Sequence, residues 1–220
     1  MDNVLNYVPE LIEATAITIQ LTLAIIIVAF VAALVAGSAR LSRWRIVRLV
    51  AGIYVEVFRG ASALIILFWI YYALPFFGVS LDAYMAAVIG LGLNSGAYGA
   101  EIVRGAILAV PKGQYEAATA LNFTSLQRLR YVILPQAIVM MMPPFGNKCV
   151  EILKATSLVS LITLTDLTAR GKQLATITFQ PIEVFLIVLV IYFVIASIIS
   201  FVMRRLEAAL ARNVGRRVVA

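Results

Sequence analysis

The chain has 220 residues, of which 63% are apolar and 13% charged, and its mean hydropathy of +1.00 lies outside the range of soluble globular domains. Histidine is absent and cysteine occurs once, as Cys149, which excludes a Cys/His zinc site, a disulfide framework and a Cys-His nucleophile. The net charge of +7 does not indicate nucleic-acid binding, because the basic residues stand in short runs beside apolar segments, as at the cytoplasmic face of a membrane protein.

Apolar segments recur along the whole chain, which predicts an all-α integral membrane protein. A helix of about 20 residues, rising about 1.5 Å per residue, crosses the hydrocarbon core of a bilayer. The predicted spans are 14–39, 60–81, 83–100, 147–165 and 184–203. The fourth is the least clear, because Pro135, Pro143 and Pro144 interrupt the apolar stretch before it. A count of four or six spans also fits the sequence.

Arginine and lysine predict the orientation of these spans. They cluster after the first, third and fifth spans, whereas only Arg170 and Lys172 of the 18 basic residues lie in segments assigned to the outside. The first 13 residues contain Asp2, Glu10 and Glu13 and no basic residue. The N-terminus is therefore predicted outside and the C-terminus in the cytosol. The three clusters are Arg40, Arg43, Arg45 and Arg48; Arg104, Lys112, Arg128 and Arg130; and Arg204, Arg205, Arg212, Arg216 and Arg217.

Small and polar residues inside the spans have more than one interpretation. Gly92 and Gly96 form a GxxxG pattern with Gly99 nearby, and such residues favour close helix packing over ligand binding. Six polar residues need partners in the bundle interior or in a cavity. They are Asn94, Ser95, Tyr98, Thr156, Ser157 and Ser160. Hydrogen bonding between helices and a solute path fit them equally well. Since none is charged, a solute path would suit a compact zwitterion, such as a polar amino acid or ectoine.

The segment 101–136 is the longest polar stretch and lies on the predicted cytosolic side. It is predicted to form a short amphipathic helix over 114–121, entered through Pro111 and Gly113. Three acid–base pairs at i,i+3 spacing are interpreted first as local ion pairs. They are Glu56 with Arg59, Glu101 with Arg104, and Glu151 with Lys154.

This segment resembles the cytoplasmic signature of ABC importer permeases: Glu-Ala-Ala, three residues, Gly, nine residues, Ile, one residue, Leu-Pro. Here Glu116-Ala117-Ala118 is followed at the same spacings by Asn122, Val132 and Leu134-Pro135. Asn122 replaces the glycine, and asparagine tolerates the left-handed conformation that such a glycine adopts. Stretches similar to the polar amino-acid branch are 56–60, 92–105, 113–118, 134–136 and 154–158. The chain departs from that branch at Ala61-Ser62, where Thr-Pro is usual.

The resemblance implies a type I ABC importer permease fold with about five transmembrane helices. It implies a single permease domain over 1–220, with a coupling loop at about 101–136, in a bacterial inner membrane. The implied partners are an ATPase subunit dimer, a second permease subunit that is identical or homologous, and an extracytoplasmic solute-binding protein. The residues implied to couple to the ATPase are Gly113, Gln114, Glu116, Ala117, Ala118 and Asn122.

The chain contains no Walker A pattern, so it is not expected to be an enzyme or to hold a cofactor, and ATP-Mg would bind to the partner ATPase. Two other classes of membrane protein are alternatives. An ion-coupled secondary transporter usually keeps ionisable residues at the centres of its spans, and these are nearly missing here. A non-transport membrane scaffold would not need the long polar segment 101–136.

Overall fold

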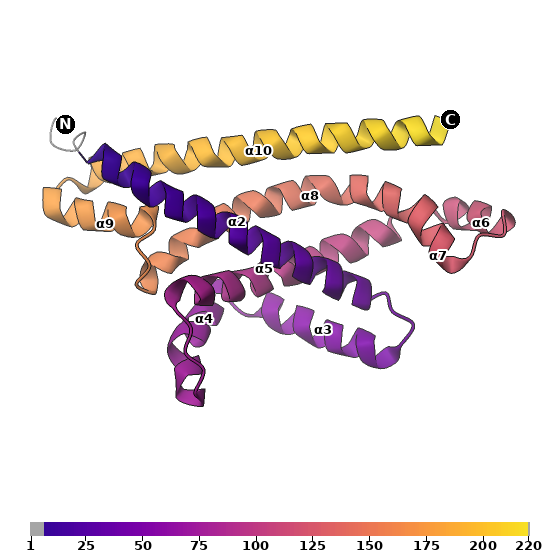
Figure 1. Cartoon of the computed structure of the whole chain (residues 1–220), viewed down its shortest axis with the longest axis horizontal. Helices are drawn as coiled ribbons and strands as arrows, with labels where there is room; N and C mark the ends of the chain where they lie inside the picture. The colour runs from indigo at the N-terminus through magenta and orange to yellow at the C-terminus, as the bar shows by residue number, and fades with distance from the viewer. Residues whose placement is uncertain (1–6, 220) are drawn as a thin grey trace.

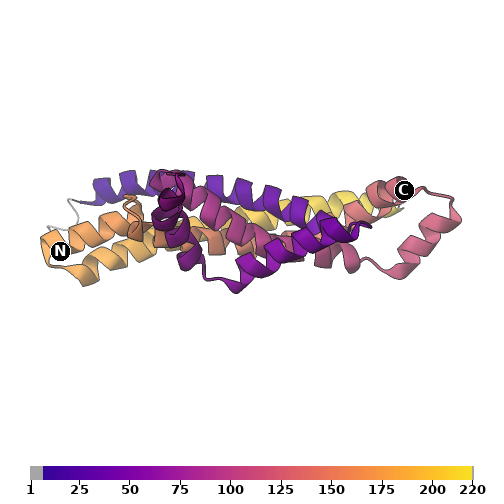
Figure 2. The ribbon, with the colours of Figure 1, turned by 90° about the horizontal axis from the view of Figure 1, so that it is seen from below.

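The structure, a computed structural model, describes residues 7–219, with side chains up to residue 212. All regular elements in that range are helical, as predicted. Four long helices lie along one axis in an elongated bundle (Figures 1 and 2): α2 Val8–Ala39, α5 Ala83–Leu108, α8 Leu134–Ala155 and α10 Pro181–Val219. The short helices α6 Lys112–Ala120 and α7 Ser125–Arg128 lie at one end of the bundle, and α9 Leu167–Thr178 lies at the other.

Two described helices, α2 and α10, are long and apolar enough to cross a membrane by themselves. The 32 residues of α2 extend over about 48 Å at about 1.5 Å per residue, so this helix exceeds a hydrocarbon core of about 30 Å. A third candidate is a pair of helices, Arg45–Gly60 and Ala63–Phe77, bent by 104°. The predicted count of five spans and the orientation stay predictions. Asp2 lies outside the described residues, as do the side chains of Arg216 and Arg217.

The helix predicted over 60–81 is shorter in the structure and contains irregular turns. Gly60 is the last residue of α3 Arg45–Gly60, and the chain turns by 104° through Ala61 and Ser62, whose extended backbones end that helix. It continues as a projecting arm, the segment Ala63–Phe77, which leaves the bundle at a steep angle (Figure 1). The arm is composed of α4 Ala63–Phe68, the π-helix Trp69–Ala73 and the 3-10 helix Leu74–Phe77. It ends at Gly78, whose φ of 83° places it in the left-handed region.

The fourth predicted span, 147–165, also begins in the wrong place. Helix α8 starts at Leu134 and runs through Pro143 and Pro144 to Ala155, and a 3-10 helix follows over Thr156–Leu161. Prolines remove backbone donors from a helix, but packing on neighbouring helices allows the helix to continue. Helix α8 packs against α5 and α10. Helix α9 was not predicted; it begins where the side chain of Asp166 accepts a hydrogen bond from the Ala169 N–H at 2.9 Å.

Helices α2 and α5 are in contact along most of their length, and glycines make this possible. A Cβ built on Gly92 would lie 2.6 Å from Val28 Cγ1, and one on Gly96 would lie 2.6 Å from Ala32 Cβ. Gly99 is equally close to Ala33. The packing interpretation of the glycine pattern is therefore confirmed.

Candidate functional site

Helix α6 is held against the end of the bundle by one of its faces. Pro111 precedes it with an extended backbone, and Tyr115 donates a hydrogen bond to the backbone oxygen of Ile107 in α5 at 3.0 Å. Ala118 is only 2% exposed. The Nε2 of Gln136, in α8, donates to Oε1 of Gln114 at 3.3 Å. Ala118 therefore packs on its own chain, whereas Gln114 bonds to α8 and stays exposed. The predicted coupling role of both residues stays untested.

The opposite face of α6 is free in the described chain. Its exposed residues recur at spacings of three and four, which places them on one side of a helix. They are Gly113, Glu116, Ala117, Ala120 and Leu121, here called the outer face of α6. Leu121, which follows the helix, is 68% exposed although it is apolar. Ala120 and Leu121 were missed in the sequence analysis, although the same helical spacing would have identified them.

Asn122 ends α6 in the way that the sequence predicts. Its φ of 58° is left-handed. The N–H of Phe123 donates to the Ala118 oxygen at 3.0 Å and the N–H of Asn122 to the Thr119 oxygen at 2.9 Å. This is the Schellman pattern of a helix C-terminus. Asn122 is thus a residue that shapes the turn after α6, and its predicted role as a coupling residue stays untested.

The segment after α6 fixes its direction. Thr124 and Gln127 form a capping box at the start of α7. Arg128, in the same helix, donates to the Thr119 hydroxyl of α6 at 3.1 Å. The π-helix Leu129–Ile133 then leads directly into α8. Helix α6 is therefore attached at one end to α5 and at the other to α8.

Two of the polar residues of α5, Asn94 and Tyr98, hydrogen-bond to the end of another helix. Asn94 is buried, and its Nδ2 donates to the Phe58 oxygen at 2.6 Å. Tyr98 donates to the Arg59 oxygen at 3.1 Å. Both bonds satisfy carbonyls at the C-terminus of α3, where no intrahelical donor is available. For Asn94 the structure favours hydrogen bonding between helices, the alternative interpretation of this residue.

Cations gather around Tyr98, contrary to the prediction of an uncharged path. The ammonium of Lys148 lies 4.4 Å from the centre of the Tyr98 ring, and the Arg59 guanidinium lies 5.4 Å from it. Ser95 and Lys148 both line a cavity of about 370 Å³ between α2, α5 and α8. Lys148 also pairs with Glu151.

Two of the three predicted local ion pairs are wrong. Glu151 pairs with Lys148 rather than with Lys154, and within residues 7–212 no ion pair joins Glu56 to Arg59. The predicted pair of Glu101 with Arg104 is confirmed. Spacings of three in both directions along a helix give Glu151 two possible partners, so the sequence alone did not choose between them.

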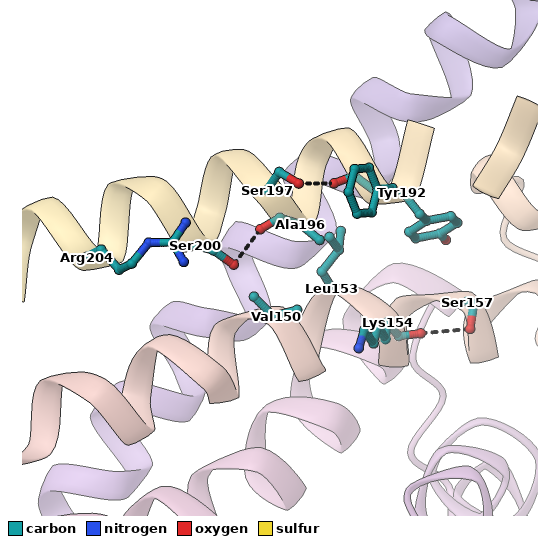
Figure 3. Close-up of a pocket in the computed structure, with 10 residues that line it drawn as sticks. Val150, Leu153, Lys154, Ser157, Tyr192, Ala196, Ser197, Ser200 and Arg204 are labelled. Carbon is teal, nitrogen blue, oxygen red and sulfur yellow. Dashed lines mark hydrogen bonds between the residues drawn. The ribbon is translucent and has the colours of Figure 1, made fainter. Parts of the chain in front are cut away.

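A groove with a volume of about 560 Å³ lies between α8 and α10 and has polar side chains around it (Figure 3). Ser157 and Lys154 come from the α8 side, and Ser197, Ser200 and Arg204 from α10. The Ser157 hydroxyl donates to the backbone oxygen of Lys154 at 2.7 Å, whereas no ion pair joins the Lys154 ammonium to another of the residues 7–212. The other two predicted path residues lie elsewhere: Thr156 is fully buried, and the Ser160 hydroxyl accepts from Lys172 at 3.0 Å. Ser95 and Ser157 therefore line two different hollows, and the predicted solute path stays untested.

Comparisons with protein families, with the sequences of known proteins and with solved structures agree on the kind of protein. The profile of the family described as "Binding-protein-dependent transport system inner membrane component" matches residues 25–212. The chain is 46% identical to the probable amino-acid ABC transporter permease protein y4tF of Sinorhizobium fredii, over 96% of this chain and 92% of that protein. It is 39% identical to the glutamine transport system permease protein GlnP of Escherichia coli, over 91% and 92%.

A solved structure agrees with these relatives. The crystal structure of an amino acid ABC transporter with histidines contains a chain that superposes on this one with a TM-score of 0.89 at 35% identity. The superposition covers 94% of this chain and 97% of the other. The likeness therefore extends over nearly the whole fold, including the bundle and the helices at both of its ends.

Proposed function

Since this chain belongs to the family of inner membrane components of binding-protein-dependent transport systems, we propose that it moves an amino acid, or a similar small zwitterion such as ectoine, across that membrane. It is a membrane permease subunit of an ABC importer with the type I importer fold, and it lies in the inner membrane. It has no ATPase site of its own, so a partner subunit hydrolyses ATP. These relatives and this fold set aside the ion-coupled carrier and the scaffold.

The observation that carries the mechanism is the outer face of α6. It presents one carboxylate, Glu116, among small and apolar side chains, at the end of the bundle away from α9. We place the dimer of ATPase subunits against this face. The small residues Gly113 and Ala117 let a groove of the partner come close to the helix, and Glu116 pairs with a basic side chain at its rim.

Movement of the ATPase subunits reaches the membrane through α6. Because α6 is attached to α5 by Tyr115 and to the start of α8 by Gln136, a push on it shifts both helices together. Closure of the ATPase pair would then switch the bundle between inward-facing and outward-facing states as a rigid-body change. An extracytoplasmic solute-binding protein delivers the solute to the outward-facing state.

A second permease subunit, identical or homologous, would complete the transport unit. The projecting arm supports this: Phe76 is 90% exposed and Phe77 is 72% exposed, and the arm contains π and 3-10 turns. Irregular backbone at membrane depth is tolerated where protein covers it or where it lines a cavity. A second permease subunit would supply that cover.

The solute would pass the groove between α8 and α10, which is open in the single subunit. Lys154 and Arg204 offer positive charge to a carboxylate, while Ser157 and Ser197 offer hydroxyls.

Replacing Glu116 tests the docking role. In a reconstituted complex with its ATPase and binding protein, Glu116→Lys should remove solute-stimulated ATP hydrolysis, since losing one partner of a partly buried charged pair costs about 2 to 5 kcal/mol. Glu207→Lys makes the same charge change on α10 and should behave like the parent. Co-purification reports assembly separately. If Glu116→Lys assembles and couples like Glu207→Lys, Glu116 does not dock the ATPase.

A further inference from the structure

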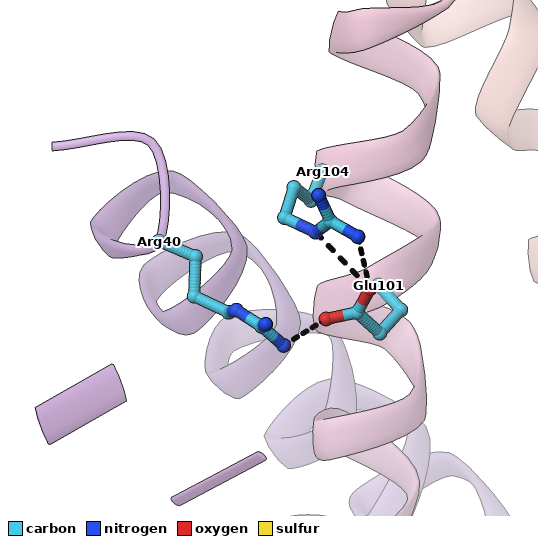
Figure 4. Close-up of polar contacts among 3 residues, drawn as sticks. All are labelled: Arg40, Glu101 and Arg104. Atoms are coloured by element: carbon cyan, nitrogen blue, oxygen red, sulfur yellow. Dashed lines mark hydrogen bonds and ion pairs between the residues drawn. The ribbon is translucent and has the colours of Figure 1, made fainter. Parts of the chain in front are cut away.

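Three charged side chains join α2 to α5 at the end of the bundle that carries α6 (Figure 4). Glu101 of α5 pairs with Arg40, which caps the C-terminus of α2, and with Arg104, one turn further along α5. Arg104 donates to Glu101 Oε2 from Nη2 at 2.8 Å and from Nε at 3.1 Å, whereas Arg40 donates to the other oxygen, Oε1. Each carboxylate oxygen therefore serves a different helix contact, one within α5 and one between α5 and α2.

This cluster is charged under physiological conditions. Burial alone would raise the pKa of Glu101, but the hydrogen bond from Arg104 and the charges of Arg40, Arg104 and Arg59 outweigh it and hold the pKa below its usual value. A carboxyl group whose pKa is lowered by folding contributes stability above its unfolded pKa and loses it only as the pH falls through the lowered value. The pair between Arg40 and Glu101 is therefore intact at neutral pH.

The pair lies where the close backbone contact of α2 and α5 ends. A Cβ on Gly37 would be 2.8 Å from the Ala100 oxygen and 2.7 Å from Val103 Cβ, so the absence of a side chain at Gly37 allows α2 to lie directly on α5 here. Helix α2 ends at Ala39, whereas α5 continues to Leu108 and carries α6. Beyond this level α5 has Gly105, around which nothing lies within 4 Å of a built Cβ. The pair thus joins α5 to Arg40, the residue that caps the C-terminus of α2.

We propose that Glu101 is a positioning residue that makes α2 move with α5 when α6 is displaced, an inference that rests on the docking role proposed for α6. A push on α6 enters α5 through the Tyr115–Ile107 bond, about two turns beyond Glu101. The pair of Glu101 with Arg40 transfers this displacement from α5 to α2, so that the two helices move together. Helix α2 then carries it to the far end of the bundle, where the Thr18 hydroxyl accepts from the Leu167 N–H of α9 at 3.0 Å.

Three single variants separate this role from simple stability of α5. Arg40→Gln and Glu101→Gln both remove the link between the helices, whereas Arg104→Gln removes only the contact within α5. With α6 docking intact, the first two should lower the amount of solute transported per ATP hydrolysed by about tenfold, within the range of coupling between two sites. Arg104→Gln should lower this ratio by less than about twofold. Similar losses in all three variants would overturn the proposal, because they would indicate a general weakening of α5.

A covalent bridge between the two helices provides the most direct test. In a Cys149→Ser background, which removes the single native cysteine, Arg40→Cys with Glu101→Cys can be joined by a short bis-thiol-reactive linker. If α2 and α5 move as one body, the bridge should restore the transport ratio that the unbridged double variant has lost. If the bridge blocks transport, the helices slide past each other and the proposal is wrong.

The docking of α6 on the ATPase and the link between α2 and α5 through Arg40 and Glu101 can be disproved separately. If Glu116→Lys couples like the parent, the docking of α6 is wrong whatever Arg40→Gln does. Glu116→Lys could remove solute-stimulated ATP hydrolysis while Arg40→Gln keeps the parental ratio of solute transported per ATP hydrolysed. In that case the docking of α6 is supported and the proposed link between α2 and α5 is wrong. Co-purification with the ATPase should be unchanged in Arg40→Gln, since Arg40 caps α2 and does not belong to the outer face of α6.

Discussion

At the residue scale, Asn122 shows how one backbone angle sets the direction of the segment that follows α6. Its left-handed φ allows the Phe123 N–H to reach back to Ala118, so the chain turns sharply toward α7. Asparagine and glycine adopt this conformation at low cost, whereas a β-branched side chain collides with the backbone. The substitution of asparagine for the glycine usual in similar permeases therefore keeps the geometry.

The stability of variants at Asn122 should follow how well the new residue adopts a left-handed φ. Asn122→Gly should unfold at the parental temperature or slightly above it, while Asn122→Val should lose about 1 to 2 kcal/mol and lower coupling, because α6 would be displaced. Thermal unfolding of the purified protein in detergent, followed by circular dichroism, measures the first effect. Equal unfolding temperatures for the glycine and valine variants would contradict a left-handed requirement at this position.

At the scale of the elements, the contact between α2 and α5 depends on the absence of side chains. Gly92, Gly96 and Gly99 lie along one side of α5, and each comes within 2.6 Å of an α2 side-chain atom when a Cβ is built. Gly105 belongs to the same helix but has open space around it. The two kinds of glycine cannot be told apart by helix propensity, since both weaken an isolated helix to the same extent.

Because Gly105 lies in the same helix and has open space around it, it serves as a control for substitution of Gly96. Gly96→Ala should destabilise the protein by about 1 to 3 kcal/mol, because the new methyl group overlaps Ala32 and forces the helices apart. Gly105→Ala should be neutral or stabilise by up to about 1 kcal/mol, the helix-propensity gain of alanine over glycine. Both variants can be compared by thermal unfolding in the same detergent. A Gly96→Ala protein as stable as Gly105→Ala would show that the packing relaxes freely.

At the scale of the whole molecule, the described subunit has features that a single chain leaves incomplete. The groove between α8 and α10 is open, the projecting arm extends away from the bundle, and the outer face of α6 is uncovered. These three surfaces correspond to the solute, the second permease subunit and the ATPase in the proposed function. Each surface lies on a different part of the bundle, so all three partners can bind at once.

Lys154 should matter for transport and not for assembly. A hydrogen bond between charged groups contributes about 1.5 to 3 kcal/mol, and every 1.4 kcal/mol is tenfold in affinity, so Lys154→Met should reduce amino-acid uptake by at least about tenfold. The measurement is initial uptake into proteoliposomes that contain the binding protein and the ATPase. Lys172→Met, a lysine outside the groove, should retain uptake. Parental uptake by Lys154→Met would remove the groove from the solute path.

The sequence by itself determined the membrane class, the helical fold, the short helix α6 and the turn at Asn122. These follow from composition, from a period of three to four residues and from the allowed backbone angles of one residue type, all of which act over short stretches of chain. The three-residue spacing of Glu101 and Arg104 likewise predicted their pair correctly. The outer face of α6 was also within reach, because its five residues follow helical spacing.

Only the tertiary structure decided which of the available partners each polar side chain takes. Glu101 pairs with Arg40, 61 residues earlier, and Asn94 bonds to the Phe58 carbonyl, 36 residues earlier. The bend at Ala61-Ser62 and the continuation of α8 through Pro143 and Pro144 also depend on neighbouring helices. Contacts between distant segments leave no local period in a sequence. In an apolar bundle many alternative pairings satisfy the same composition, and packing selects among them.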